Sequence, residues 1–469
     1  MIELTLAEIA EAVNGRLVLG GSGAETQTVV TGNAQTDSRE IRDGQIFFAR
    51  PGEETDGHLF AAKAVDAGAA LLVVEREVDG RVPQIVVADS TEALGDLAGA
   101  VMRRLQQNTR LTVIGITGSN GKTTTKNLVR AMAEQLGETV AAEKSFNNEV
   151  GGPITMLRTT DSTETLVAEM GASGEGEIAK LTAMAPPNIG VVLSVGLAHA
   201  GEFGGIESTF RAKSEMVRDL PESALAVLNR DDPYVARMAE LTSARVRWFG
   251  QHPEADVRAS DIDPRVDGTR FTIHADGQSM PVHFPVLGEH HVMNALAAAT
   301  VALELGLPLE QIVEVLQLHT RAARWRMEVM GGRDEITVIN DAYNASPDSM
   351  SAALRTLAQI RRPGGRTVAV LGAMSELGEY SVEEHIRIGL QAVRLRISEL
   401  VVVGADARHL HISAINEGSW DGESVFFETQ DEAYEYLINT LRPEDTVIVK
   451  SSNSAGLRFL GDRLGETYA

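Results

Sequence analysis

The chain has 469 residues, more than one ordinary hydrophobic core accommodates, so its length predicts two or three domains. Its 66 acidic and 42 basic side chains leave a formal net charge of -24, which argues against nucleic acid or an anionic membrane surface as the main partner. The absence of cysteine excludes disulfides, thiolate metal ligands and a cysteine nucleophile.

Residues 1–108 predict a small α/β domain. They begin with the amphipathic, acidic segment MIELTLAEIAEAVNG, which is unlike a signal peptide, and continue with short strands and turns. The segments AAKAVDAGAALLVVE and PQIVVAD then alternate helix and strand. Because no apolar run in the chain approaches the roughly 18 residues of a membrane span, we expect a cytoplasmic protein without membrane insertion.

Residues 109–319 predict a central domain with a parallel sheet. The apolar strands LTVIGITG, ETLVAEMGA, NIGVVLSVG and LAVLN recur with helical segments between them, as crossover connections require. From about 255 to 287 short alternating strands predict an antiparallel extension, and an alanine-rich helix follows. Residues 320–469 alternate strand and helix in an open, doubly wound, Rossmann-like pattern, so the chain is predicted as an α/β protein of three domains.

The segment GITGSNGKTTTK, Gly115–Lys126, follows a buried strand and opens a helix, which is the context of a phosphate-binding loop. Its glycines let backbone N–H groups turn inward, the helix N-terminus adds a positive dipole end, and Lys122 adds a point charge. The hydroxyl of Thr123 can bind magnesium. A strict P-loop has a glycine where Ile116 stands, so a tight glycine turn with a chance Gly-Lys-Thr is the alternative. The strand-loop-helix context favours a site for a nucleoside triphosphate.

Two further polar residues follow strands of the predicted central sheet. Glu169 ends the strand TLVAEM, and His199 of LAHAGEF follows the strand NIGVVLSVG. The carboxyl ends of parallel strands share one edge, where ligands bind, so Glu169 is placed to hold magnesium on a phosphate. A solvated strand-end glutamate and a structural histidine are the alternatives, and the phosphate loop upstream favours a metal or phosphate cluster.

Lys213 lies on the apolar face of a predicted helix. In STFRAKSEMVRDL it is spaced with Phe210, Val217 and Leu220 at intervals of three and four residues. An inward ammonium must lose its proton, meet an anion or be chemically modified, and a neutral amine can add carbon dioxide to give a carbamate that binds magnesium. The alternative is a lysine whose stem packs inside while its ammonium reaches solvent, and the helix alone favours this alternative.

These residues and their surroundings resemble the Mur ligase family of ATP-dependent, amide-forming enzymes of cell-wall precursor synthesis. The similarity extends over nearly the whole chain through TDSREIRDGQIFFARPGEETDGH, TGSNGKTTTK, SFNNEVGGP, EMGASGEGEI, VGLAHAGEFG, RAKSEM, LNRDD, GEHHVMNALAA, RMEV, NDAYNASPDSM and LGAMSELGEY. The family's loop has the form TGxNGKT, which explains the unusual register. NDAYNASPDSM and LGAMSELGEYS are most similar to the members that add D-alanyl-D-alanine to UDP-N-acetylmuramoyl-tripeptide, and an Asp-Asn-Pro-Arg motif of the diaminopimelate-adding members is missing from the sequence.

The resemblance implies a role for each matching residue. ATP would be bound by Gly118, Ser119, Asn120, Gly121, Lys122, Thr123, Thr124, Asn294, Arg326, Asp341, Tyr343 and Asn344, with Asn294 at the adenine and Arg326 reaching the phosphates across the interdomain cleft. Magnesium, expected as two ions, would be held by Thr123, Glu169, His199 and Lys213 as its carbamate. The catalytic set would be Lys122, Lys213, His199 and Arg326, and the UDP-sugar would bind Ser38, Arg39, Asp56, Gly57 and His58.

The sequence departs from the family pattern at several positions. Asparagine often stands in place of Ser173 and Ser346, and aspartate in place of Ala373. The family's Lys-Gly-Ser-Arg is Lys-Ser-Ser-Asn at residues 450–453, so Asn453 lacks a guanidinium that could bind a carboxylate. Recognition of the peptide substrate by this segment is therefore expected to differ, whereas the metal and phosphate residues are unaffected.

The implied reaction passes the γ-phosphoryl group of ATP to the tripeptide carboxylate, and the amine of D-alanyl-D-alanine then attacks the acyl phosphate. The protein is expected to act as a monomer that closes its domains around the substrates. A folate polyglutamate ligase would share the chemistry, but its phosphate loop lies near the start of the chain, whereas here about 108 residues precede it. A non-catalytic ATP-binding regulator would explain the loop but not the combination of Glu169, His199 and Lys213.

Overall fold

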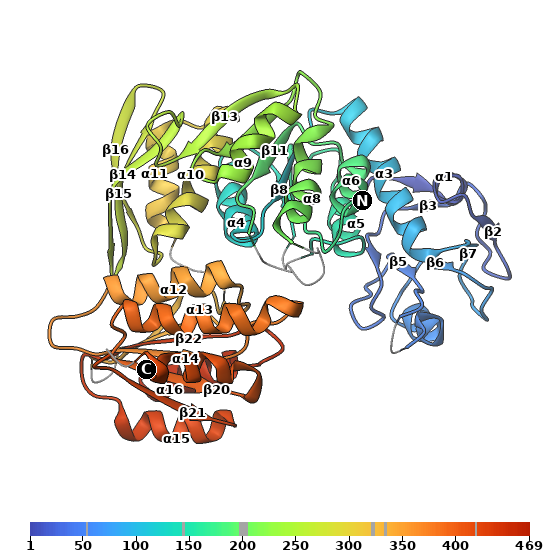
Figure 1. Ribbon diagram of the computed structural model, residues 1–469. Coiled ribbons are helices and arrows are strands. Elements are labelled where there is room, and N and C mark those ends of the chain that lie inside the picture. Colours follow the sequence, from blue (N-terminus) through green and yellow to red (C-terminus); the bar gives the residue numbers. More distant parts are fainter. Residues whose placement is uncertain (53–54, 143–145, 197–204, 320–323, 333–334, 418–419) are drawn as a thin grey trace.

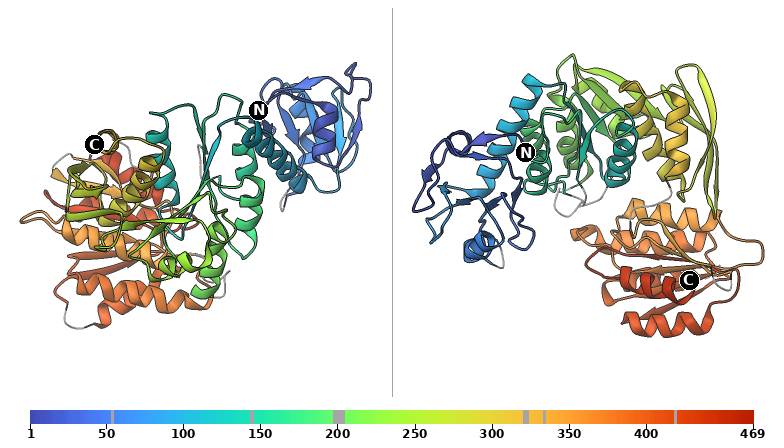
Figure 2. Two further views of the ribbon diagram at one scale, coloured as in Figure 1. Left: turned by 90° about the horizontal axis from the view of Figure 1, so that it is seen from above. Right: turned by 180° about the vertical axis from the view of Figure 1, so that it is seen from behind.

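The protein is an α/β molecule whose described residues form three large sheets along the chain and one small two-stranded sheet (Figure 1). The computed structural model describes residues 1–52, 55–142, 146–196, 205–319, 324–332, 335–417 and 420–469. The central sheet lies between the amino-terminal part and the carboxyl-terminal part of the molecule in every view (Figures 1 and 2). Each sheet falls within one of the three ranges expected from the sequence, so the α/β fold class with three domains is confirmed. None of the described helices is both long and apolar enough to cross a membrane.

The amino-terminal part contains a five-stranded sheet of order β2-β7-β6-β5-β4, in which only the β2–β7 pair is antiparallel. Its middle strands consist of the apolar runs IFF and LLVV, which are buried on both faces as expected for parallel strands. A separate antiparallel pair joins β1 and β3. The elements are β1 (Leu4–Thr5), α1 (Leu6–Ala12), β2 (Arg16–Val18), β3 (Val29–Val30), β4 (Ala34–Gln35), β5 (Ile46–Phe48), η1 (Gly57–Phe60), α2 (Ala61–Asp66), β6 (Leu71–Val74), β7 (Gln84–Val86) and α3 (Ser90–Asn108).

Helix α3 joins the amino-terminal and central parts through one hydrophobic core. It packs against α1 and β5 on one side and against the central helices α5 (Gly151–Met156) and α6 (Glu177–Met184) on the other. Gly95 on α3 allows the close approach, because a Cβ there would collide with the end of the Met184 side chain. The continuous apolar cluster therefore ties the first sheet to the second.

The central sheet has nine strands in the order β16-β15-β14-β13-β12-β11-β8-β10-β9. The six strands from β9 to β13 pair in parallel, so their carboxyl ends meet at one edge. Strand β8 is central and buried, with β10 and β11 beside it. The elements not yet given are β8 (Thr112–Thr117), α4 (Lys122–Ala133), β9 (Thr139–Ala141), β10 (Thr165–Glu169), β11 (Ile189–Val192), α8 (Ile206–Arg218), β12 (Leu225–Asn229), α9 (Pro233–Arg237), η2 (Met238–Leu241) and β13 (Arg245–Gly250).

The antiparallel extension expected at about 255–287 is formed by β14 (Val257–Arg265), β15 (Gly268–Ala275) and β16 (Gln278–Phe284). Strand β14 pairs in parallel with β13, so the extension continues the central sheet rather than forming its own. Pro281 lies in the edge strand β16, where a missing backbone N–H costs no ladder bond. Helices α10 (Glu289–Glu304) and α11 (Leu309–Leu318) cover one face and complete the second core.

The carboxyl-terminal sheet has the order β17-β18-β22-β19-β20-β21, and only its edge strand β17 is antiparallel. Helix α12 lies against α10 and β14 and faces the central part (Figure 1). The elements are β17 (Glu328–Gly331), β18 (Thr337–Asn340), α12 (Pro347–Gln359), β19 (Thr367–Leu371), η4 (Gly378–Tyr380), α13 (Ser381–Arg394), β20 (Glu399–Val403), η5 (Ala405–Ala407), α14 (Arg408–Asn416), β21 (Glu423–Phe427), α15 (Gln430–Thr440), β22 (Thr446–Lys450) and α16 (Arg458–Thr467).

Candidate active site

The loop between β8 and α4 has the backbone of an anion-binding turn. Gly118 and Gly121 adopt φ angles of 152° and 86°, which side chains rarely allow. Gly121 occupies the N-cap of α4, and no side chain among the described residues caps the helix, so the first N–H groups are left to an anion. The Lys122 ammonium donates a 2.6 Å hydrogen bond to the carbonyl of Gly118. Burial lowers the pKa of Lys122, and the Glu169 carboxylate partly opposes this shift.

Glu169 provides the oxygen donors for a cation beside the loop. Its side chain, at the end of β10, is 2% exposed. Its Oε1 accepts hydrogen bonds from the Thr123 hydroxyl at 3.3 Å and from the Asn147 amide at 3.1 Å. Its Oε2 is buried and has no hydrogen-bond partner among the residues that the structure describes. A buried, unsatisfied carboxylate oxygen next to a hydroxyl fits a hard divalent cation such as Mg²⁺.

The structure describes only some of the other predicted metal ligands. His199 lies outside the described residues. Among the described part of the chain, no group of three or more histidine, aspartate or glutamate side chains converges on one point. Thr123 and Glu169, together with phosphate and water oxygens, would suit Mg²⁺ at a nucleotide.

Lys213 is buried as its helical spacing predicts. It lies on α8 with 2% of its surface exposed, so the alternative of an ammonium in solvent is wrong. Burial, together with the positive charge of Lys122, lowers the pKa of Lys213 to about 7. A substantial neutral fraction near neutral pH makes this amine available for reaction with an electrophile.

The carboxyl-terminal part brings an arginine to the phosphate loop. The Arg326 guanidinium lies 3.4 Å from the Thr123 hydroxyl and 4.2 Å from the centre of the Tyr343 ring. Asp341 accepts a 2.6 Å hydrogen bond from the buried Lys450 ammonium and a 2.9 Å bond from the Met327 backbone N–H. These contacts fix the segment that carries Arg326 and the segment after β18 in one arrangement.

A cavity of about 520 Å³ separates the phosphate loop from the carboxyl-terminal part, a size suited to a nucleotide. The predicted ATP residues that line it are Ser119, Asn120, Gly121, Lys122, Thr123, Thr124, Asn294, Arg326, Asp341, Tyr343 and Asn344, joined by Glu169. Gly118 belongs to the same loop but not to the lining. The sequence interpretation missed other lining residues, among them Asn147, Ser194, His290, His291, Ser346, Asp348, Arg355 and Lys450. Several of these stand in quoted segments such as SFNNEVGGP and NDAYNASPDSM, which were the available signal.

Two further residues at this cavity are not among the ATP-binding residues that the resemblance implied. The Ser346 hydroxyl at the N-cap of α12 donates a 3.1 Å hydrogen bond to the Asn120 side chain of the phosphate loop. His290 is half-buried at the cavity, and desolvation lowers its pKa to about 4, so this imidazole is neutral at neutral pH.

The five residues predicted for a UDP-sugar lie in the amino-terminal part and do not line the cavity. Arg39 forms a two-pronged ion pair with Asp37, and its guanidinium lowers the pKa of Asp37 to about 2. His58 is buried, with Nδ1 2.6 Å from the Asp56 carboxylate and Nε2 accepting from the Glu75 backbone N–H. Because both ring nitrogens are used internally, His58 fixes the turn around Gly57, and its contact with a ligand stays a prediction.

Three domain descriptions of known proteins match successive parts of the chain. The description "Mur ligase middle domain" matches residues 116–302, "Mur ligase, glutamate ligase domain" matches 325–453, and "Mur ligase family, catalytic domain" matches 33–102. A UDP-N-acetylmuramoyl-tripeptide--D-alanyl-D-alanine ligase of Mycobacterium tuberculosis is 44% identical and is aligned over 99% of this chain and 98% of its own length. The chain belongs to the Mur ligase family. The Escherichia coli protein of the same description is 33% identical over 97% of both chains.

Solved structures of Mur ligases agree with the fold. The crystal structure of MurF from Acinetobacter baumannii has a TM-score of 0.88 and 33% identity and covers 99% of each chain. The MurF ligase of Thermotoga maritima in complex with ADP has a TM-score of 0.81 and 26% identity, over 94% of this chain and 99% of its own. A folylpolyglutamate synthase of Mycobacterium tuberculosis covers 78% of this chain with a TM-score of 0.61 and 18% identity, which is a likeness of fold alone.

Proposed function

We propose that this Mur ligase uses ATP to join D-alanyl-D-alanine to UDP-N-acetylmuramoyl-tripeptide. The observation that carries the proposal is similarity along the whole length to relatives described as ligases of these two substrates, at up to 44% identity. A structural relative was solved with ADP, and the cavity next to the glycine-rich loop has the size and donors for such a nucleotide. The product would be the pentapeptide precursor of peptidoglycan.

The proposed reaction has two steps. The terminal carboxylate of the tripeptide attacks the γ-phosphorus of ATP, the bond to the β-phosphate oxygen breaks, and ADP and an acyl phosphate result. The amine of D-alanyl-D-alanine then attacks the acyl carbon, the bond from that carbon to the phosphate oxygen breaks, and inorganic phosphate and one proton from the attacking nitrogen are released. Lys122 and Arg326 would neutralise the charge of the transferring phosphoryl group, and the N-terminus of α4 would bind the other phosphates of ATP. The reaction needs no nucleophile from the protein itself.

Magnesium would be held by Thr123 and Glu169, and its charge would offset that of the phosphates. His199 and a carbamate on Lys213 would be further ligands, and two magnesium ions would bind in total. The burial of Lys213 and its lowered pKa support a carbamate, because only the neutral amine adds carbon dioxide.

Each of the three domains would bind a different ligand of the reaction. Residues 1–108 would bind the UDP-sugar through Ser38, Arg39, Asp56, Gly57 and His58, residues 109–319 would bind ATP, and residues 320–469 would close over it and receive the amino substrate. Asn294 would contact the adenine, a role that its place beside Gly121 supports. The enzyme would work in the cytoplasm as a monomer, without a nucleic-acid partner, where its nucleotide substrates are made.

Turnover tests the proposal. Release of phosphate from ATP is measured with Mg²⁺ and UDP-N-acetylmuramoyl-tripeptide, in parallel with lysine and with diaminopimelate as the third residue, with and without D-alanyl-D-alanine. We expect sustained release only with both peptide substrates, and the pentapeptide product in equal amount. Dihydropteroate with glutamate replaces the substrates in a control arm, because a folate ligase has a related fold. Background release with both proposed substrates, or turnover in the folate arm alone, would refute the assignment.

A further inference from the structure

The backbone on both sides of Arg326 is strained. Trp325 and Met327 have φ angles of 60° and 53°, in the left-handed region that side chains disfavour. Such a conformation persists only when its surroundings enforce it. Arg326 is the residue of this turn that reaches Thr123 on the phosphate loop, so whatever enforces the turn also aims the guanidinium.

Three contacts act on the main chain of this turn. The Trp325 N–H donates to the Glu328 carboxylate at 2.9 Å, and the Met327 N–H donates to Asp341 at 2.9 Å. The Tyr343 N–H donates to the Trp325 carbonyl at 3.1 Å. Glu328 and the segment after β18 therefore hold the backbone of the turn, but none of these bonds fixes the direction of the Trp325 side chain.

The Trp325 side chain is held by a carboxylate on the last helix. Its indole N–H lies 2.9 Å from Oδ1 and 3.0 Å from Oδ2 of Asp462 on α16. The same carboxylate accepts from Arg324 at 3.1 Å, just before the turn. The guanidinium groups of Arg324 and Arg458 also contact the indole ring, at 4.5 Å and 5.4 Å from its centre.

Asp462 is itself held by strand β18 of the carboxyl-terminal sheet. The Asn340 amide, fully buried at the end of β18, donates to Asp462 at 2.9 Å and to the Arg458 carbonyl at 2.9 Å. Gly461 permits this contact, because a Cβ there would collide with the Asn340 amide. The carboxylate of Asp462 is 18% exposed and does not line the nucleotide cavity.

We propose that Asp462 is a positioning residue: it ties the strained Trp325–Met327 turn to β18 and α16 and thereby directs Arg326 toward the transferring phosphate. The inference rests on the proposed function, because it assigns Arg326 to the phosphoryl group. Asp462 touches neither nucleotide nor substrate and acts only through Trp325 and the turn.

A double-mutant cycle tests the inference in the full chain. D462A is expected to lower kcat about tenfold and to leave KM for ATP within about twofold, because Arg326 acts on the transition state. R326A is expected to lower kcat further, and the double variant should equal R326A alone, because a residue that works through Arg326 has no effect once Arg326 is gone. W325F, which removes the indole N–H together with part of the ring system, should lower kcat at least as much as D462A. Asp431→Ala is the matched control, because it breaks an exposed ion pair to the neighbouring Arg463.

The outcomes separate the possible failures. Losses that multiply in the double variant would show that Asp462 acts on stability or elsewhere, and the inference would be overturned. If D462A does not fold, the W325F and R326A pair gives the same cycle. A crystal structure of either folded variant is a readout independent of turnover: an Arg326 side chain unchanged beside Thr123 overturns the inference even if the wild-type protein is not the proposed ligase. Absence of turnover in the wild type refutes the proposed function instead.

Discussion

Lys213 is a buried lysine that lies close to a second positive charge. It is 2% exposed, and the neighbouring charge of Lys122 adds to burial in disfavouring its protonated form. Addition of carbon dioxide to the neutral amine releases one proton and replaces a cation by an anion. A carbamate would therefore turn repulsion with Lys122 into attraction and would add an anionic oxygen that a divalent cation can bind.

Substitution of Lys213 tests this chemistry. Lys213→Ala should lower kcat by a factor of about 100 or more, on the scale of a lost transition-state charge, and acetate or formate at millimolar concentration should restore part of the rate. Phosphate release under saturating substrates is the measurement. Lys450→Ala is the matched control, because Lys450 is an equally buried lysine at the cavity whose ammonium pairs with Asp341. Rescue of both variants, or full activity of Lys213→Ala without additive, would contradict the carbamate.

Individual site residues could be predicted from the sequence when a local pattern fixed their surroundings. The helical spacing around Lys213 placed it on an apolar face, although only the family resemblance favoured a buried amine, and the strand before Glu169 predicted its place at the carboxyl edge. Asn147 was missed, because its contact with Glu169 depends on how a loop folds back across the sheet. Lys450 was treated only as part of a substrate-binding segment, although its ammonium is enclosed by Asp341 and Asn344.

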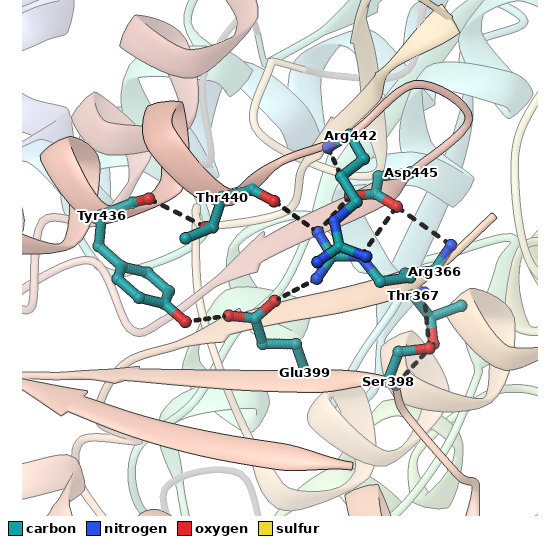
Figure 3. Close-up of polar contacts among 8 residues, drawn as sticks. All are labelled: Arg366, Thr367, Ser398, Glu399, Tyr436, Thr440, Arg442 and Asp445. Atoms are coloured by element: carbon teal, nitrogen blue, oxygen red, sulfur yellow. Dashed lines mark hydrogen bonds and ion pairs between the residues drawn. The ribbon is translucent and has the colours of Figure 1, made fainter.

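At the scale of elements, a buried ion network joins strands of the carboxyl-terminal sheet at the end where these strands begin (Figure 3). Arg366, just before β19, contacts Asp445 at 2.7 Å and Glu399 of β20 at 3.1 Å, and donates to the Thr440 carbonyl at the end of α15. The Tyr436 hydroxyl donates to Glu399 at 2.6 Å, and burial together with this carboxylate raises the pKa of Tyr436 to about 12. One guanidinium thus connects two strand starts with a helix end.

Loss of this guanidinium should destabilise the carboxyl-terminal part strongly. The side chains of Asp445 and Glu399 are 1% and 4% exposed, so Arg366→Met leaves two buried carboxylates without their cation. We expect a loss of about 3–5 kcal/mol in the free energy of unfolding. Urea unfolding followed by Trp420 fluorescence, with the other two tryptophans replaced by phenylalanine, measures it. Asp431→Ala, which removes an exposed ion pair with Arg463 in the same part of the molecule, should change stability by less than about 1 kcal/mol. Equal effects would contradict the role of the network.

Long apolar strands with helices between them were predictable as elements, because their burial on both faces leaves continuous runs such as TVIGIT and TVAVL. The shortest strands were not located individually. Strands β1, β3 and β4 have only two residues each, so no periodicity can form, and their pairing depends on distant partners such as Val30 for Leu4. The parallel pairing of β14 with β13 was equally hidden, since sheet order is a property of the assembled sheet.

At the scale of the whole molecule, the apolar cores do not follow the three sheets one by one. One cluster runs from Met1 through α3 into the central part as far as Ala244, so the first two parts share buried surface. The carboxyl-terminal part has two further clusters, one of which also takes in Leu287 of the central part, and its hydrogen bonds to the phosphate loop include those of Ser346 with Asn120 and Arg326 with Thr123. The sequence suggested three separate domains, because a shared core leaves no local mark on the helix that carries it.

This distribution of cores predicts two unfolding transitions rather than three. Trp248 in β13 packs against the shared core, and Trp420 packs against a core of the carboxyl-terminal part, so single-tryptophan variants that retain one or the other report different units. Urea midpoints should differ without ligand. A non-hydrolysable ATP analogue with Mg²⁺ at about 100 times its Kd should add about 2.7 kcal/mol to the state that binds it and should raise both midpoints, because the cavity is lined by both units. Lys122→Ala is the control in which neither midpoint should move with the analogue. Coincident midpoints without ligand, or a shift confined to Trp248, would show that the two parts are coupled differently from the arrangement of their cores.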